Sequence, residues 1–309
     1  MTIRFDGRVA IVTGAGNGLG RSHALGLAAR GAKVVIVDFG GARDGTGGST
    51  EAAEKVVAEI KAAGGEAIAH GANVADFAQV QDMVRKTMDT WGRIDILINN
   101  AGILRDKTFT KMELADFEAV VDVHLMGTVN CTKAVWDIMR AQNYGRIVFT
   151  SSSSGLYGNF GQANYGAAKA AMVGLMNVLH QEGAKNDIRV NTLAPTAATR
   201  MTEELMSPET LALLTPESIT PGVLFLVSEK GPSRTILCAG AGAFARTIIY
   251  ETDGIWLDEA ERTPETIAAR FDDISNPAGQ KALQGAFEQT AKFAMKAAAA
   301  KGIALPPRA

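Results

Sequence analysis

The sequence predicts an α/β fold in which helices cover both faces of a parallel sheet. Short runs of β-branched residues alternate with longer helical patterns along most of the chain, and this alternation is typical of parallel sheets. A glycine-rich turn joins the first strand to the first helix, and 47% of the 309 residues are hydrophobic, which is enough to build a large core. Together these observations predict a Rossmann-type, doubly wound parallel sheet of seven strands with a C-terminal helical extension.

Strands and helices alternate in a regular order. The first strand, residues 8–14, precedes a helix at 19–31, and the second strand, residues 33–38, precedes a helix at 49–65. Further strands are predicted at 66–73, 94–102, 145–154, 188–195 and 234–240, and further helices near 76–91, 113–140 and 163–185. No linker rich in proline or serine interrupts the series, so residues 1–245 are predicted to form one domain.

Residues 246–309 are predicted to form the helical extension. The segments 263–274 and 281–301 carry apolar residues at helical spacing. Amphipathic helices bury their apolar side, so we expect the extension to pack on the same domain or on a partner subunit. A frayed terminus is the alternative interpretation.

The composition argues against several classes of partner. A net charge of −2 and a pI near 6.1 give no basic excess for nucleic acid or an anionic membrane. Cys131 and Cys238 lack the spacing of a disulfide framework or a metal site, so we expect a reducing compartment and no metal. No apolar stretch has the length of a signal peptide or membrane span, and the last residues are not a peroxisomal signal. We therefore expect a cytoplasmic protein with no nucleic-acid or membrane partner.

The segment TGAGNGLG directly follows the first predicted strand and begins a helix. Gly14 suits the tight turn, Gly18 leaves room for a pyrophosphate, and Gly20 lets the helix pack closely on the sheet. Asn17 and Leu19 stand in the same turn, where the first N–H groups of the helix and the positive end of its dipole face an anion. The segment therefore predicts dinucleotide binding, and a purely structural turn is the alternative.

Asp38 ends the second predicted strand and favours NAD as the cofactor. An acidic side chain at this place can bind the ribose hydroxyls of the adenosine and repels a 2′-phosphate. Asn17 stands where an arginine could have bound such a phosphate, which also favours NAD over NADP. Arg43 could reverse the preference if the glycine-dense loop 39–49, longer than the usual about 2 to 6 residues, brought its guanidinium back.

Tyr165 and Lys169 stand four residues apart on a predicted helix and so share one face. A tyrosine has a pKa of about 10, which must fall by about 3 before the side chain can serve as a base near neutral pH. A neighbouring ammonium and an oxidised nicotinamide would both favour the phenolate. Ser152 lies at the carboxyl end of the preceding strand, where its hydroxyl can hold a substrate oxygen, whereas Ser151, Ser153 and Ser154 are interpreted as turn and strand-end residues. A surface aromatic beside a solvated lysine is the alternative.

These motifs, with NNAG at 99–102, resemble the short-chain dehydrogenase/reductase family over roughly residues 5–245. The resemblance implies that Tyr165 is the general acid/base, that Ser152 orients the alcohol or carbonyl, and that Lys169 binds the nicotinamide ribose and lowers the tyrosine pKa. Besides Tyr165 and Lys169, the cofactor contacts are expected from Gly14, Asn17, Gly18, Leu19, Gly20, Asp38, Asn73, Val74, Asn100, Ala101, Gly102, Pro195, Thr196 and Thr199.

The segments VHLMG and SGLYGNFGQANY carry a closer resemblance, to the (3R)-hydroxyacyl-CoA dehydrogenase units of the peroxisomal multifunctional enzymes type 2, the 17β-hydroxysteroid dehydrogenase type 4 group. It implies an NAD-dependent oxidoreductase of lipid metabolism that interconverts a (3R)-3-hydroxyacyl-CoA, a fatty-acyl or steroid side-chain thioester, and its 3-oxoacyl-CoA. The alternatives are a 17β-type hydroxysteroid dehydrogenase on free steroid, an NADPH-dependent 3-oxoacyl reductase and, more remotely, a catalytically silent NAD-binding sensor or scaffold. The helices near 113–140 and 163–185 resemble those that pair in homodimers and homotetramers of the family.

The sequence departs from the family pattern at two places. His124 stands where many members have an asparagine, and a water-bridging histidine and a satisfied helix histidine both fit the position. Pro195 is followed by Thr196 where the family usually has glycine, so Thr196 or Thr199 is expected to contact the nicotinamide amide.

The substrate side is predicted to involve residues 196–215, which follow the sixth strand and could close as a lid over nicotinamide and substrate. Its apolar side chains suit an acyl chain or a steroid ring: Met201, Leu205, Met206, Leu211 and Leu214. A short helix packed on the core is the alternative. Arg105, Lys107 and Lys111 are expected either to meet coenzyme A phosphates or to form a solvated basic face.

Overall fold

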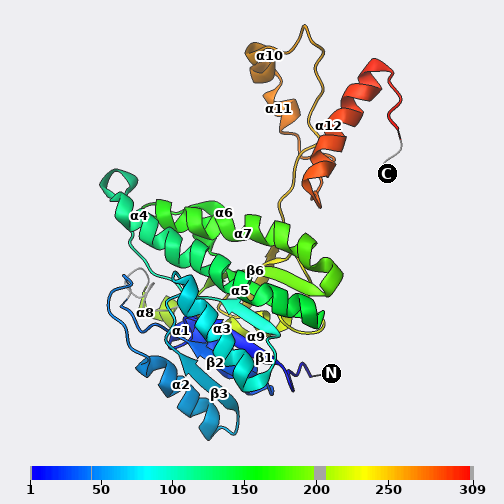
Figure 1. Cartoon of the computed structure of the whole chain (residues 1–309). Helices are drawn as coiled ribbons and strands as arrows, with labels where there is room; N and C mark the ends of the chain where they lie inside the picture. The colour runs from blue at the N-terminus through cyan, green and yellow to red at the C-terminus, as the bar shows by residue number, and fades with distance from the viewer. Residues whose placement is uncertain (1, 43, 198–206, 307–309) are drawn as a thin grey trace. The chain divides into compact units, whose positions relative to one another are not determined.

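One eight-stranded sheet organises the first of the two units into which the chain divides, Met1–Arg246 and Thr247–Ala309. The computed structural model describes residues 2–42, 44–197 and 207–306. The strand order is β3-β2-β1-β4-β5-β6-β7-β8, and Figure 1 labels β1, β2, β3 and β6 of this sheet. The strands are β1 (Val9–Thr13), β2 (Lys33–Val37), β3 (Glu66–His70), β4 (Ile96–Asn99), β5 (Gly145–Thr150), β6 (Ile188–Thr196), β7 (Ile236–Gly240) and β8 (Ala243–Thr247).

Strands β1 to β7 pair in parallel, which confirms the predicted doubly wound α/β fold. The sheet has one strand more than predicted. β8 follows β7 after Ala241 and Gly242, whose φ angles of 49° and 77° are typical of a tight hairpin turn. Its side chains are exposed or half-buried, so no apolar pattern marks this strand in the sequence.

Helices of the first unit follow the predicted order. They are α1 (Gly18–Ala28), α2 (Glu51–Ala62), α3 (Phe77–Trp91), α4 (Leu114–Val121), α5 (Gly127–Gln142), α6 (Ser153–Tyr157), α7 (Ala163–Gly183), α8 (Pro208–Leu213) and α9 (Thr220–Leu226), with 3₁₀ turns at Phe109–Lys111, Ala184–Asn186 and Pro216–Ser218. A π-helical turn, Asp122–Met126, joins α4 to α5. The interpretation of Ser153 and Ser154 as turn and strand-end residues is wrong, because they begin α6 after Ser152 caps it.

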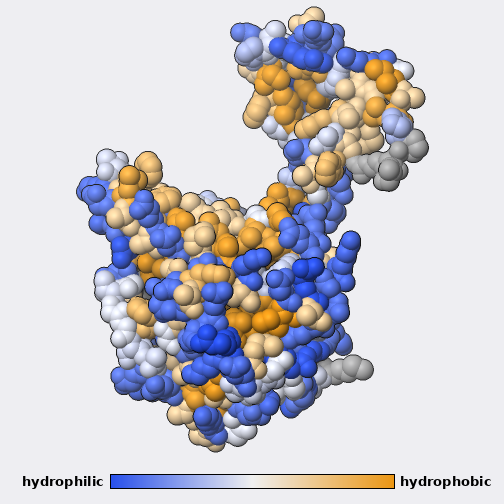
Figure 2. All heavy atoms as spheres, viewed as in Figure 1, coloured by the Kyte–Doolittle hydropathy of each residue, from blue (hydrophilic) through white to orange (hydrophobic). Residues whose placement is uncertain are grey.

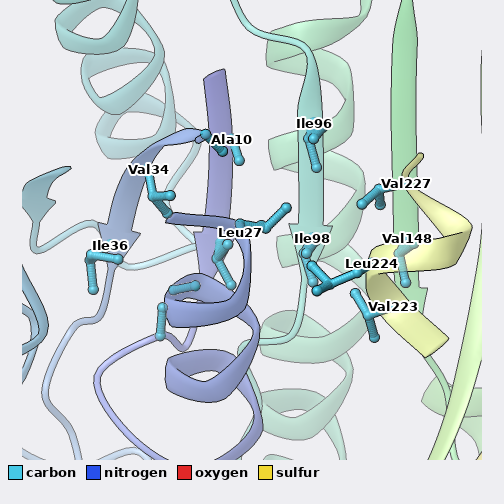
Figure 3. Packing of buried hydrophobic residues seen from close by; sticks show 14 of the residues in the cluster. Ala10, Leu27, Val34, Ile36, Ile96, Ile98, Val148, Val223, Leu224 and Val227 are labelled. Carbon is cyan, nitrogen blue, oxygen red and sulfur yellow. The ribbon is translucent and has the colours of Figure 1, made fainter. Parts of the chain in front are cut away.

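Helices cover both faces of the sheet, and alternate strand residues face each layer. On one face α1, α2 and α9 pack on side chains such as Ala10, Val34 and Ile96 (Figure 3). On the other face α3, α5 and α7 pack on the intervening side chains, such as Ile11 and Val35. Because both faces are buried, the strands are nearly continuous apolar runs in the sequence.

The strand order reverses beside β1, which lies between β2 and β4. In open α/β sheets, ligands bind outside the carboxyl ends of the strands at such a switch point. The glycine turn follows β1, NNAG includes the end of β4, and Ser152 follows β5. The predicted cofactor and catalytic motifs therefore lie at the same edge of the sheet.

Charged side chains gather at the opposite edge, where the strands begin. Asp95, just before β4, has a fully buried side chain. Its carboxylate accepts hydrogen bonds from Arg8 Nη1 at 3.0 Å, from Arg93 Nε at 2.8 Å and from the backbone N–H of Val9 at 2.9 Å. This carboxylate thus joins the starts of β1 and β4.

His23 is a second buried polar group, on α1. It is 0% exposed, and its Nδ1 shares a hydrogen bond of 2.8 Å with Oγ1 of Thr220, the first residue of α9. Burial lowers the pKa of His23 to about 3. The folded protein therefore keeps this ring neutral at a pH where the unfolded chain would protonate it.

We expect His23 to make the protein less stable as the pH falls. Below pH about 6.5 the unfolded chain takes up a proton on His23 that the folded chain excludes, so the free energy of unfolding falls by about 1.4 kcal/mol per pH unit until the folded pKa is reached. Above that pH the group has no effect. Urea unfolding between about pH 7 and pH 5 measures how the free energy of unfolding changes with pH. In His23→Asn this slope should correspond to one proton fewer taken up on unfolding. Equal slopes in the wild type and the variant would contradict the assignment.

Within its described residues, 247–306, the second unit contains three helices, α10 (Pro264–Ala269), α11 (Phe271–Ile274) and α12 (Ala286–Lys301). Within it, Lys296 Nζ donates to Asp253 Oδ2 at 2.6 Å. Many of its apolar side chains are exposed, as the orange atoms of this unit in Figure 2 show: Ile249, Ile267, Phe287, Phe293, Met295 and Ile303. The helices confirm the predicted helical extension, and the surface on which it packs stays a prediction.

Candidate active site

The glycine turn between β1 and α1 brings backbone segments very close together. Gly14 has a φ of +62°, and a Cβ atom there would lie 2.8 Å from Ala101 Cα. A Cβ atom at Gly20 would lie 2.2 Å from the carbonyl oxygen of Gly14. Larger residues would push the turn apart, so both glycines are needed to shape this part of the site.

The N-terminus of α1 is available to an anion. Asn17 is the N-cap residue, but its side chain makes no capping hydrogen bond. Asn17 and Gly18 are exposed, whereas Leu19 is half-buried and packs on the core. The first N–H groups of α1 and its positive dipole end can therefore face a pyrophosphate, so the turn fits the predicted dinucleotide.

The NNAG segment holds the glycine turn in place. The backbone N–H groups of Asn100 and Ala101 donate to Thr13 Oγ1 at 2.9 and 3.0 Å. Asn100 Nδ2 also donates to the carbonyl oxygens of Thr13 and Gly14, each at 3.1 Å. Gly102 faces His124, since a Cβ atom there would lie 2.3 Å from His124 Cε1. These residues position the glycine turn, and their direct contacts with a cofactor stay a prediction.

Asp38 directly follows β2 and lines a cleft of about 520 Å³ together with Gly16 and Asn17. Its Oδ2 accepts a hydrogen bond from the N–H of Gly16, and its Oδ1 accepts one from the N–H of Gly40, both at 2.7 Å. These bonds fix the carboxylate. Each carboxylate oxygen can accept a second hydrogen bond, so the ribose hydroxyls of a dinucleotide fit here.

Asn73 and Val74 lie between β3 and α3. Asn73 Oδ1 accepts from the N–H of Ala75, and the N–H of Asn73 donates to Gln79 Oε1, both at 3.0 Å. Val74 is buried, and its carbonyl oxygen accepts from Asn130 Nδ2 at 3.0 Å. Both residues are held by their neighbours, and their contact with the adenine stays a prediction.

Ser152, Tyr165 and Lys169 come together at the carboxyl end of β5. Ser152 is 8% exposed, and its side chain lowers the pKa of Tyr165 as a hydrogen-bonding neighbour. Lys169 is 4% exposed, and its Nζ donates to the carbonyl oxygen of Thr150, the last residue of β5, at 2.6 Å. The same Nζ lies 5.5 Å from the centre of the Tyr165 ring. The three side chains therefore share one site, in which Ser152 and Lys169 are buried and Tyr165 is half-buried.

Burial governs the charge states of Tyr165 and Lys169. It raises the pKa of Tyr165; the hydrogen bond with Ser152 opposes this effect, and the charge of Asp106 adds to it. Burial lowers the pKa of Lys169 to about 7. Burial thus also disfavours the Lys169 ammonium in the chain alone, and the role of Lys169 in lowering the tyrosine pKa stays a prediction.

His124 lies in the π turn and belongs to the same site. It is buried, and its Nε2 lies 2.8 Å from the carbonyl oxygen and 3.1 Å from the N–H of Ile103. Its ring meets the Tyr165 ring edge-on, with the centres 5.2 Å apart. Burial holds the pKa of His124 well below its ordinary value, so the ring is neutral. The π turn, a feature frequent at functional sites, thus presents a neutral ring to Tyr165.

Pro195 and Thr196 are the last two residues of β6 and pair with Ala239 and Gly240 of β7. Pro195 was predicted to belong to this strand, but the prediction that Thr196 already follows it is wrong, because pairing with β7 extends the strand through Thr196. Of the expected lid, α8 is described and Leu214 is buried, at 9% exposed. Other predicted residues lie outside the described ones: Arg43, Thr199, Met201, Leu205 and Met206.

Arg105 and Lys107 share one carboxylate. Asp116 accepts from Arg105 Nη1 at 3.2 Å and from Lys107 Nζ at 3.1 Å. All three line a second cleft of about 530 Å³, and Lys111 is exposed nearby in the chain. Asp116 thus offsets much of the positive charge that was expected to meet coenzyme A phosphates.

The sequence profile of the short chain dehydrogenase family matches residues 8–210. The chain is a short-chain dehydrogenase. The match runs from β1 to the start of α8, so it includes the glycine turn, Ser152, Tyr165 and Lys169. This dehydrogenase is thus an oxidoreductase of a family that acts on CH–OH groups with NAD(H) or NADP(H).

Known proteins similar to this dehydrogenase support the closer resemblance. It is 46% identical over 275 residues to a short-chain type dehydrogenase/reductase of Mycobacterium tuberculosis, which covers 89% of this chain and 96% of the relative. It is 44% identical over 288 residues to peroxisomal multifunctional enzyme type 2 of Mus musculus, which covers 91% of this chain and 39% of the mouse enzyme. The solved structure of full-length peroxisomal multifunctional enzyme type 2 from Drosophila melanogaster has a TM-score of 0.79 and 38% identity, over 96% of this chain and 50% of that chain. The resemblance to type 2 enzymes is confirmed, and this dehydrogenase spans half or less of their length.

Within residues 2–42, 44–197 and 207–306, no helix is long and apolar enough to cross a membrane. In the same ranges, no three histidine, cysteine or carboxylate side chains gather as a metal site would require. The cellular location stays a prediction.

Proposed function

We propose that this short-chain dehydrogenase uses NAD to interconvert a (3R)-3-hydroxyacyl-CoA and the matching 3-oxoacyl-CoA. The observation that carries the proposal is the convergence of Ser152, Tyr165 and Lys169 at the carboxyl ends of the strands, beside the glycine turn. The substrate class is supported by 44% identity to a type 2 multifunctional enzyme over 91% of this chain. We also expect a homodimer or homotetramer, as the resemblance implies.

The chemistry follows from the positions of these groups. In oxidation, the Tyr165 phenolate takes the proton of the substrate hydroxyl while Ser152 holds the oxygen by a hydrogen bond. The carbinol C–H and O–H bonds break and a C=O bond forms. Bound NAD⁺ supplies the acceptor for the hydride. Because burial raises the pKa of Tyr165, the phenolate needs nearby positive charge, which Lys169 and an oxidised nicotinamide offer.

The adenosine end of the site supports NAD over NADP. Asp38 presents a carboxylate fixed by two backbone N–H groups, which repels a 2′-phosphate. Two cations line the same cleft, but Arg21 is paired with Glu59 and Lys55 with Glu51. A phosphate would therefore meet a carboxylate and cations that already have partners.

A panel of substrates with both cofactors tests the proposal. We expect oxidation of (3R)-3-hydroxyacyl-CoA esters with NAD⁺, and a kcat/KM with NADP⁺ that is lower by about 100-fold, since juxtaposed like charges cost several kcal/mol. NADH absorbance gives the rates. Turnover of free hydroxysteroids alone would contradict the substrate class, and equal efficiency with NADP⁺ would contradict the cofactor.

Two serine substitutions distinguish the role of Asp38 in cofactor preference from the general effect of removing a negative charge. Asp38→Ser should raise kcat/KM with NADP⁺ by about tenfold, because the repelling carboxylate is gone. Asp44→Ser is the matched control: Asp44 lies in the same loop, but its carboxylate accepts from Thr46 and does not line the Asp38 cleft. A change of cofactor preference in both variants, or in neither, would overturn the role of Asp38.

A further inference from the structure

Gln162 joins the first turn of α7 to a loop that is distant in sequence. Its Nε2 donates to Asp106 Oδ2 at 2.6 Å, and its Oε1 accepts from Ser154 Oγ at 2.7 Å and from Asn159 Nδ2 at 3.0 Å. The backbone of Gln162 also forms an isolated parallel bridge with Lys107. Every polar atom of this side chain is therefore used, and its amide can take only one orientation.

Gln162 occupies the N-cap position of α7 but does not cap the helix. Serine, threonine, asparagine or aspartate at this position would stabilise the helix by bonding its free N–H groups. The Gln162 side chain reaches the 103–108 loop instead. Two residues later, Asn164 does the same: it is 0% exposed, its Nδ2 donates to the Arg105 carbonyl oxygen at 3.0 Å, and its Oδ1 accepts from the N–H of Tyr165 at 2.7 Å.

The loop 103–108 is held at both ends beside the catalytic tyrosine. At its start, Ile103 bonds to His124, whose ring lies against Tyr165. Near its end, Asp106 bonds to Gln162, three residues before Tyr165 on the same helix start. Leu104 to Lys107 line the second cleft. A wall fixed to the reacting helix in this way keeps a bound alcohol at a constant distance from the phenol.

We propose that Gln162 is a positioning residue that fastens Asp106, and with it the substrate-side wall 103–108, to the helix carrying Tyr165 and Lys169. This proposal rests on the proposed function, in which Tyr165 exchanges a proton with the substrate. The wall governs how the alcohol is placed, whereas Ser152, Tyr165 and Lys169 carry the chemistry.

The test begins with Gln162→Glu, which replaces the bond to Asp106 by two facing carboxylates. We expect KM for the alcohol to rise by about tenfold with kcat changed by less than about threefold. The rise in KM should be larger near pH 8 than near pH 6, because the two facing carboxylates can share a proton only at the lower pH. Gln181→Glu is the matched control, since the Gln181 side chain also lies on α7 but donates to the Asn177 carbonyl oxygen of its own helix.

A double variant distinguishes this bond from a general loss of structure. Combining Asp106→Asn with Gln162→Glu reverses donor and acceptor and rebuilds the bond, and the introduced carboxylate can still accept from Ser154 and Asn159. We expect the double variant to recover KM to within about threefold of wild type at both pH values. No KM change in Gln162→Glu, or no recovery in the double variant, would overturn the proposal.

Amide hydrogen exchange of residues 103–108 in the free protein gives a readout that needs no substrate. Gln162→Glu should exchange faster there than the wild type, and the double variant should not. If the wild type fails to oxidise any hydroxyacyl-CoA, the proposed function fails while this exchange test still stands. Unchanged exchange in an active Gln162→Glu variant would reject the positioning role alone.

Discussion

Tyr165→Phe should lower kcat for alcohol oxidation by about 10³-fold, because it removes the group that takes the substrate proton. The ring, which lies edge-on to His124 with centres 5.2 Å apart, stays in place. Ser152 and Lys169 keep their positions beside α6 and on α7. NAD⁺ affinity should therefore change by less than about threefold, and steady-state NADH absorbance together with NAD⁺ titration measures the two quantities.

The pH profile sharpens this prediction. Burial raises the pKa of Tyr165, so oxidation by the wild type should become faster as the pH rises and the phenolate forms. This dependence should disappear from the residual activity of Tyr165→Phe. Tyr157→Phe is the matched control: Tyr157 belongs to the same YGNFGQANY segment but is 70% exposed, and we expect its rate within about twofold of wild type. Equal losses in the two variants would contradict the assignment.

Local spacing was sufficient to predict that Ser152, Tyr165 and Lys169 come together, whereas their catalytic roles stay a proposal. Tyr165 and Lys169 share a face because helix geometry places residues four apart together, and Ser152 follows a parallel strand whose end lies at the same edge of the sheet. Asp38 was predictable for the same reason, since it directly follows β2. The positions of these side chains are set locally, within one strand, one turn or one helix.

Other features depend on contacts between distant segments, and the sequence could not reveal them. Asp116 forms ion pairs with Arg105 and Lys107. The side chains expected to form a basic face are therefore part of a cluster of paired charges. Gln162 reaches Asp106 across 56 residues of sequence. The π turn around His124 has no propensity signal, because the same residues also suit an ordinary α-helix. Tertiary packing decides each of these.

Asp95→Ala should lower the free energy of unfolding by about 3 kcal/mol, since removing one partner of a buried ion pair leaves the other charge uncompensated. The Asp95 side chain is 0% exposed and bonds both Arg8 and Arg93. The expected loss is at the lower end for buried pairs because Arg8 and Arg93 are 24% and 42% exposed and regain water. Urea unfolding at neutral pH measures it.

Asp6→Ala is the control that isolates burial in this prediction. Asp6 bonds Arg4 Nε and Nη2 much as Asp95 bonds Arg93, yet Arg4 and Asp6 are 54% and 64% exposed. Exposed pairs contribute little, so its unfolding midpoint should stay at the wild-type value. Asp95 lies at the amino ends of β1 and β4, opposite the catalytic edge, so folded Asp95→Ala should keep the wild-type kcat. A large loss of kcat without a loss of stability would contradict this separation, in which one edge of the sheet holds the fold together and the other carries the chemistry.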